Sequence, residues 1–308
     1  MKTIIHSAAV AAFVLLPSVA LADPVWDKVA AAFGRPGAEM PGGVYRVGLP
    51  RSDLHVTLDG VEIKPSLALG SWLAFAPMGN DTAMVMGDLV LTETEVNPVM
   101  QRLVESGIEI TALHNHLLRA APATLYMHVL GRGEPVALAT VLHDALALSG
   151  TPLTETAASG SSQPPSPSVA GGPSPAPADL DTASIDGVLG YKGRIVGGVY
   201  QVSVPRGAPV QDGGMDIPPA MGSAIAINFQ PTGGGKAAIT GDFVLTAQEV
   251  NPVLRALRAG GIEVTALHNH MLDDQPRLFF MHFWANDDAG KLAKGLRAAL
   301  DKVDVGRS

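Results

Sequence analysis

The chain of 308 residues has no cysteine, few aromatic residues (5%) and few charged residues (16%). The missing cysteine excludes disulfide bonds, thiolate metal sites, thiol nucleophiles and a lipid attached to cysteine. Because 29 acidic residues outnumber 21 lysines and arginines, the formal charge of −8 excludes broad electrostatic capture of nucleic acid or of an anionic membrane. The 47% of hydrophobic residues can still form an aliphatic core, and the length indicates two domains.

Long apolar runs are also missing, apart from one at the amino terminus. There Lys2 precedes the run Ala8–Leu16, Pro17 ends it, and the small residues Ala20 and Ala22 follow. This pattern predicts a signal peptide over residues 1–22 with cleavage after Ala22, since the run is too short for a permanent membrane span. A retained anchor is the alternative. We therefore expect a periplasmic or secreted protein with no stable membrane insertion after cleavage.

The rest of the chain is an internal duplication. Residues 87–116 and 241–270 are identical at 20 of 30 positions without a gap, at an offset of 154. Such self-similarity marks two copies of one structural unit. We predict a first repeat domain over residues 23–148, a linker over residues 149–183 that is rich in Pro, Ser, Gly and Ala, and a second repeat domain over residues 184–308.

Each copy is predicted to be an α+β domain, with an antiparallel sheet and two or three helices. Thr92 with Glu95, and Thr246 with Glu249, have the spacing of a capping box before an amphipathic helix. Asn97 is a second candidate for the first cap, because proline follows it. After each helix, two segments rich in β-forming residues predict a pair of adjacent strands, at 108–118 and 123–130 in the first copy.

Histidines give the strongest chemical signal. The pattern His-x-His-x11-His occurs once in each copy, at His114, His116 and His128, and at His268, His270 and His282. In a strand, residues i and i+2 project from one face about 6–7 Å apart, so a third histidine on the neighbouring strand could complete a trio. Three imidazoles suit catalytic zinc, and copper, nickel or iron are alternatives. The sequence predicts one such metal site in each repeat.

Acidic residues at matching positions are candidates for proton transfer beside the metal. Asp88 and Asp242 follow a glycine in both copies, and Glu109 and Glu263 also recur. In a flat strand Glu109 faces away from His114, which favours an exposed position unless a bulge intervenes. Arg51 and Arg206 could bind an anionic ligand, although pairing with an acid is the commoner role.

Several of these blocks resemble a known family. The sequences GDFVLT, EVNPVLRALR, GIEVTALHNHML and FMHFWA are similar to the LppY/LpqO family of exported bacterial proteins, and the resemblance covers both copies. It implies an extracytoplasmic, duplicated domain with no established activity. The absence of cysteine departs from the lipoproteins that the family name suggests.

Three functions remain open at the level of sequence. The first is a metal-binding protein with a histidine trio in each repeat, and a metal-dependent hydrolase is one form that it could take. The second is a non-catalytic module that binds a small molecule or an envelope polymer, with two copies joined by the linker. The third is a structural role, in which the repeats form an intramolecular pseudo-dimer and the histidines form a hydrogen-bond network in the core.

Overall fold

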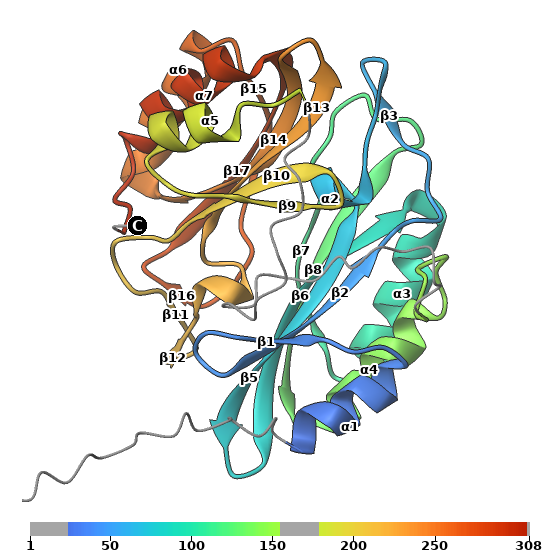
Figure 1. Cartoon of the computed structure of the whole chain (residues 1–308). Helices are drawn as coiled ribbons and strands as arrows, with labels where there is room; N and C mark the ends of the chain where they lie inside the picture. The colour runs from blue at the N-terminus through green and yellow to red at the C-terminus, as the bar shows by residue number, and fades with distance from the viewer. Residues whose placement is uncertain (1–23, 155–178, 307–308) are drawn as a thin grey trace, which may run out of the picture.

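The computed structural model describes residues 24–154 and 179–306, which form two similar α+β units (Figure 1). The predicted signal peptide and most of the predicted linker lie outside these residues. The first unit contains α1 (Pro24–Phe33), β1 (Ala38–Met40), β2 (Val44–Pro50), β3 (Thr57–Leu58), β4 (Val61–Glu62), α2 (Pro65–Ala68), β5 (Gly70–Gly79), β6 (Thr82–Thr92), α3 (Glu93–Glu105), β7 (Glu109–His114), β8 (Thr124–Gly133) and α4 (Pro135–Leu146).

The second unit repeats this order. It contains α5 (Thr182–Leu189), β9 (Arg194–Val196), β10 (Val199–Val204), β11 (Gln211–Asp212), β12 (Met215–Asp216), a short 3-10 helix (Pro219–Met221), β13 (Ile225–Gly233), β14 (Lys236–Thr246), α6 (Ala247–Ala259), β15 (Glu263–His268), β16 (Asp274–Gln275), β17 (Leu278–Asp288) and α7 (Ala289–Leu300). Helix α5 begins within the last residues that we assigned to the linker. None of the helices in the described parts of the chain is long and apolar enough to cross a membrane.

The main sheet has the same topology in both units. Its strand order is β1-β2-β5-β6-β8-β7 in the first and β9-β10-β13-β14-β17-β15 in the second, and all neighbours are antiparallel. The predicted α+β class, with an antiparallel sheet and helices in each of two tandem copies, is therefore confirmed.

Helix α3 begins as the capping box predicts. The backbone N–H of Thr92 donates to the Glu95 carboxylate at 2.7 Å, so Thr92 and not Asn97 is the cap, and Pro98 lies inside the helix. Helix α6 begins in the same way, with Thr246 bonded to Glu249 at 2.7 Å. Each helix therefore starts directly at the end of a central strand, β6 or β14.

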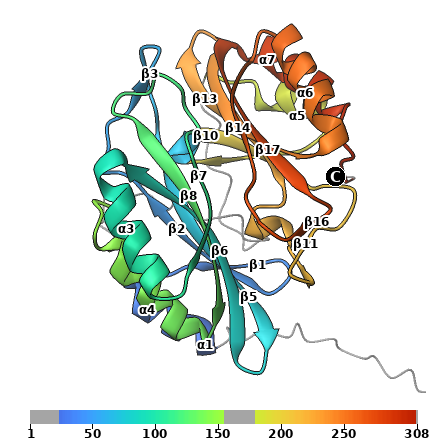
Figure 2. The same cartoon turned by 180° about the vertical axis from the view of Figure 1, so that it is seen from behind.

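The long helices lie on the outer sides of the molecule and the two sheets lie between them, whereas the short helix α2 lies between the sheets (Figures 1 and 2). One core fills the space between the first sheet and its helices. Another combines the second unit with residues of the first sheet, and a third joins Val90 and Tyr126 to Ala238 and Trp284. Strand β6 is buried from residue 83 to 91, because helices cover one face and the other repeat covers the opposite face.

Candidate metal site between the repeats

Each repeat places its three histidines at the same points of the fold. His114 is the last residue of β7, and His268 is the last residue of β15. His128 and His282 lie within the neighbouring strands β8 and β17.

The strand predicted over residues 108–118 ends earlier than expected, because β7 stops at His114 and His116 lies in the following loop. The second copy has the same arrangement, with His270 in the loop after β15. A bulge between Ile110 and Ala112 also shifts the register of β7 against β8. The period-2 argument therefore does not explain how His114 and His116 approach each other.

The aspartates lie beside the histidines of their own repeat. Asp88 on β6 is the cross-strand partner of His128, and Asp242 on β14 is the partner of His282. Directly paired residues project from the same face of a sheet. Asp88 lies 3.9 Å from Nε2 of both His116 and His128, while Asp242 lies 3.6 Å from Nε2 of His270 and 3.9 Å from Nδ1 of His282.

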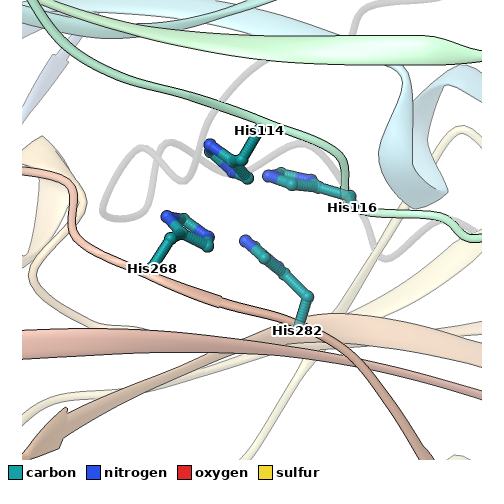
Figure 3. A group of neighbouring side chains, drawn as sticks. All are labelled: His114, His116, His268 and His282. Carbon is teal, nitrogen blue, oxygen red and sulfur yellow. The ribbon is translucent and has the colours of Figure 1, made fainter.

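The histidines of one repeat stack on those of the other. Ring centroids are 3.4 Å apart for His114 and His268, 3.6 Å for His116 and His282, and 3.7 Å for His128 and His270. Figure 3 shows four of these rings, two from each repeat, meeting at one place. The eight side chains form one assembly, here called the histidine cluster: Asp88, His114, His116, His128, Asp242, His268, His270 and His282.

The grouping differs from the three-histidine site expected in each repeat. Four sets of donor atoms in the described residues lie within 4.8 Å of one another. Two sets combine two histidines from each repeat, and two combine an aspartate with two histidines of its own repeat. They are His114, His116, His268 and His282; His114, His128, His268 and His270; Asp88, His116 and His128; and Asp242, His270 and His282. The sheets face each other, so each trio meets its counterpart.

Backbone carbonyls fix the orientation of several rings. His282 Nδ1 lies 2.8 Å from the Gly241 carbonyl, and His268 Nδ1 lies 2.9 Å from the Asn269 carbonyl. Because a carbonyl can only accept, Nδ1 carries the proton in both rings, and Nε2 of the neutral ring has a free lone pair. This is the usual support of a metal-binding histidine.

The free ring nitrogens have no hydrogen-bond partner. Most of the buried side-chain nitrogen and oxygen atoms without a partner in the described residues belong to the cluster, including Nε2 of all six histidines and one oxygen of each aspartate. A buried polar atom without a partner costs about 1–3 kcal/mol. So many together indicate that a ligand for these atoms belongs at this point.

Burial determines the charge of the cluster. It lowers the pKa of all six histidines, to about 4 for His268 and about 3 for His282, so the rings are neutral at pH 7. Burial also raises the pKa of Asp88 to about 8, against the effect of Arg46, and raises that of Asp242, to which the charge of Asp88 contributes. Neutral imidazoles are the form that binds metal ions.

Loop contacts between the repeats hold the cluster together. The Thr111 hydroxyl donates to the His270 carbonyl at 2.5 Å, and the Asn269 amide donates to the Thr111 carbonyl at 2.9 Å. Asn115 instead accepts from Leu117 N–H within its own loop, at 2.8 Å. Asn115 and Asn269 therefore each order the backbone of their own loop, and Asn269 also binds the first repeat.

The two candidate glutamates lie in ion pairs away from the cluster. Glu109 is 3.5 Å from Arg132, and Glu263 is 2.8 Å from Arg119. Asp88 and Asp242 are therefore the acids of the predicted set that accompany the histidines. Arg51 and Arg206 each bind a helix-capping carboxylate, Glu95 and Glu249, at 2.8 Å.

A cavity of about 480 Å³ opens beside the cluster. Asp88, His116, Asp242, His270 and His282 line one part of it, so both repeats contribute to its wall. Arg46, Trp72 and Arg194 line the other part, and the sequence patterns did not predict a role for them. The available signal was that these residues differ between the copies: Gln201 stands at the position of Arg46, and Ala226 at that of Trp72.

Comparison with solved structures identifies only distant similarity. A trimeric bacterial microcompartment shell protein, PduB, is 10% identical, with 88% of this chain and 96% of that chain covered at a TM-score of 0.22. EtuB from Clostridium kluyveri is 10% identical, with 86% and 88% covered at a TM-score of 0.19. Both TM-scores are too low to indicate a shared fold or a shared function.

Sequence comparison is more informative about family. None of the curated proteins matches the chain. The model of a family described as Domain of Unknown Function (DUF1259) matches residues 27–148 and again residues 183–302. The two matches cover most of the sequence, and the chain therefore belongs to this family, with two tandem copies of its domain.

Proposed function

We propose that the protein binds transition-metal ions, zinc in the first place, through the histidine cluster with ligands from both repeats. The observation that carries this proposal is the set of buried ring nitrogens without a partner. His114 and His268 belong to both four-histidine sets, which makes them the central ligands. A ring nitrogen binds a metal ion in the plane of its ring, so the stacked rings would have to rotate toward a common point for their nitrogens to hold one zinc ion.

A metal-dependent hydrolase is the activity that this site supports best. Structural zinc sites are closed by protein ligands, whereas catalytic sites keep one position open to water and substrate. The cavity of about 480 Å³ reaches Asp88, His116, Asp242, His270 and His282, and so gives a small molecule access to the cluster.

The chemistry follows from the neighbours of the metal. A zinc ion held by the histidine cluster would lower the pKa of a coordinated water toward 7 and would polarise the substrate. Asp88 and Asp242 lie within 4 Å of the histidines, and the positive charge of a bound ion would lower their raised pKa values, so that the ionised carboxylates would accept the proton that this water releases. Glu109 and Glu263 are not assigned this role, because each is engaged by an arginine.

The two alternative functions are less well supported. A core hydrogen-bond network does not fit, because the hydrogen bonds of His268 and His282 are to backbone carbonyls and their Nε2 atoms have none. A non-catalytic module that binds a small molecule or an envelope polymer would use the same cavity, and ligand binding that a chelator does not change would favour it over a hydrolase.

We also propose that the protein is exported. The pattern of residues 1–22 and the resemblance to the LppY/LpqO family support a signal peptide that ends at Ala22 and a periplasmic or secreted location. We keep 23–148, 149–183 and 184–308 as proposed boundaries of the repeats and the linker. The unidentified partner is a small molecule or an envelope component.

Elemental analysis of the zinc-loaded protein tests the proposal. We expect bound zinc in the wild-type chain and a large loss in the triple variant His268→Ala, His270→Ala and His282→Ala, with circular dichroism as the control for folding. Equal metal content in both proteins contradicts the proposal.

In a panel of chromogenic esters and phosphate esters, hydrolysis should fall on chelation and should fall about 100-fold or more in Asp242→Asn. A zinc-loaded protein with no hydrolysis would favour the binding module.

A further inference from the structure

The cavity beside the histidine cluster has a positively charged wall. Arg46 and Arg194, which come from different repeats, line it together with Lys192. The Arg46 guanidinium lies 4.1 Å from the centre of the Trp72 ring, and its Nη1 donates to the Ala220 carbonyl at 2.7 Å. This stacking and bonding hold the guanidinium in one place.

Within the described residues neither arginine forms an ion pair with a carboxylate, and Arg46 has only a longer-range attraction to Asp88, whose pKa it lowers. In the described parts of the chain, the Arg194 side chain forms no ion pair or hydrogen bond, and Arg46 forms only the bond to Ala220. By contrast, the guanidinium groups of Arg51 and Arg206 are each paired with an acid. Burying a guanidinium group without a charged partner raises the free energy of the folded protein, unless a bound anion pairs with it.

The two repeats differ at these positions although their cluster residues match. Arg46 is paired in register with Ala38, and Arg194 is paired with Gln201. Repeat one therefore has alanine where repeat two has Arg194, and repeat two has glutamine where repeat one has Arg46. The duplication has kept the histidines and aspartates twice, but has given each repeat one different cation on the cavity wall.

We propose that the cavity binds a small molecule through an oxyanion, a phosphoryl or carboxylate group, held between Arg46 and Arg194 next to the metal. This rests on the proposed function, because it names the substrate class of the same site. Guanidinium groups present N–H donors in a planar fork that matches such oxygens.

The charges near the cavity agree with this assignment. Burial lowers the pKa of Arg46 to about 10, with a contribution from the charge of Arg194, and burial lowers that of Arg194 to about 10. Both groups are therefore still cationic at pH 7, and the loss of water around them strengthens attraction to an anion. A metal ion on the neutral histidines would add further positive charge.

The test is calorimetric titration of the full chain, metal-free and zinc-loaded, with inorganic phosphate and separately with acetate. Arg46→Gln and Arg194→Ala each introduce the residue that the other repeat has at that position, which favours correct folding. We expect each to weaken binding of the preferred anion about 10-fold or more, because each removes a charged hydrogen-bond donor to the anion. Arg102→Gln, at an exposed ion pair with Asp144, is the matched control and should bind as the wild type does.

The outcomes separate this inference from the metal proposal. Stronger binding of phosphate assigns a phosphoryl group, and stronger binding of acetate assigns a carboxylate. If the wild type binds neither anion, or if the two cavity variants bind as tightly as the wild type, the inference is wrong. Zinc content, measured on the same samples, should be unchanged in all three arginine variants. A chain that takes up no zinc but binds the anion through Arg46 and Arg194 contradicts only the proposed function.

Discussion

At the scale of single residues, the histidine cluster lowers the stability of the folded protein when no cation is bound. Six neutral rings and two carboxyl groups, buried or half-buried, each have at least one buried nitrogen or oxygen atom without a hydrogen-bond partner. The sequence identified all eight of these residues, because each occurs twice at the same spacing. It did not show that His114 stacks on His268, since an offset between copies says nothing about how the copies pack.

The capping carboxylate Glu95 is a residue whose removal should be measurable. Its carboxylate accepts from Arg51, from Thr92 N–H and from Gly150 N–H, and so joins the end of β2, the start of α3 and the segment after α4. Because Arg51 is fully buried, we predict that Glu95→Gln lowers the free energy of unfolding by about 1–3 kcal/mol. Urea denaturation measures it, with Glu93→Gln at the same helix end as the control; equal stability of the two variants would contradict the network.

The same carboxylate predicts a pH dependence. Burial alone would raise the pKa of Glu95, but the hydrogen bonds from Arg51, Gly150 and Thr92 outweigh it and hold the pKa below 4.5. A carboxylate with a lowered pKa in the folded state stabilises the protein above its unfolded pKa, and this stabilisation is lost as the pH falls below about 4.5. The free energy of unfolding of the wild type should therefore fall more steeply between pH 6 and pH 3 than that of Glu95→Gln. Parallel curves for the two proteins would refute this role of Glu95.

At the scale of elements, the central strands place the aspartates. Gly87 precedes Asp88 and Gly241 precedes Asp242, and a Cβ at either glycine would overlap the neighbouring strand at the Trp72 or Ala226 carbonyl. The Gly241 carbonyl also accepts the His282 ring N–H. The Gly-Asp pair seen twice in the sequence thus allows two strands to approach closely and directs one histidine.

We predict that Gly241→Ala destabilises the chain by about 1–3 kcal/mol, because the added methyl group forces β13 and β14 apart. It should also reduce zinc content, since Asp242 and His282 would shift. Gly187→Ala in α5 is the matched control: nothing lies within 4 Å of its added Cβ, so its stability should be unchanged or slightly higher. Thermal unfolding of both variants measures the difference, and a stable Gly241→Ala protein would overturn this explanation of the glycine.

The regular elements were the part of the fold most accessible from sequence. The capping boxes at Thr92 and Thr246 follow from local chemistry, and the structure agrees. Predicting the end of β7 at His114 was harder, because the residues after it are as apolar as those within it. Helix α5 was missed because it directly follows residues whose composition indicates a linker.

At the scale of the whole molecule, the facing sheets make one site from two repeats. Neither the antiparallel topology nor the histidine spacing predicts this, because the contact depends on long-range packing. Val90, Tyr126, Ala238 and Trp284 meet in a core that both repeats share, and the Trp284 indole N–H donates to Asp59 of the first repeat at 3.1 Å. The metal should therefore couple the stabilities of the repeats.

Removal of metal tests this coupling. A ligand that binds only the folded state stabilises it by about 2.7 kcal/mol at a free concentration of 100 Kd. We predict that zinc raises the unfolding temperature by several degrees in a single transition of both repeats, and that a chelator reverses the change. In the double variant His114→Ala and His268→Ala, calorimetry should show no effect of zinc, whereas a persistent zinc effect would place the ion elsewhere.

The zinc content of two single variants tests most directly whether the site is shared. His114 and His268 come from different repeats but belong to the same two four-histidine sets. We predict that His114→Ala and His268→Ala each lose most of the bound zinc. The variant His55→Ala, at an exposed side chain, should keep the zinc content of the wild type. Two variants that each keep half of the zinc would show separate sites in each repeat, and a wild-type chain that binds no zinc would contradict the account altogether.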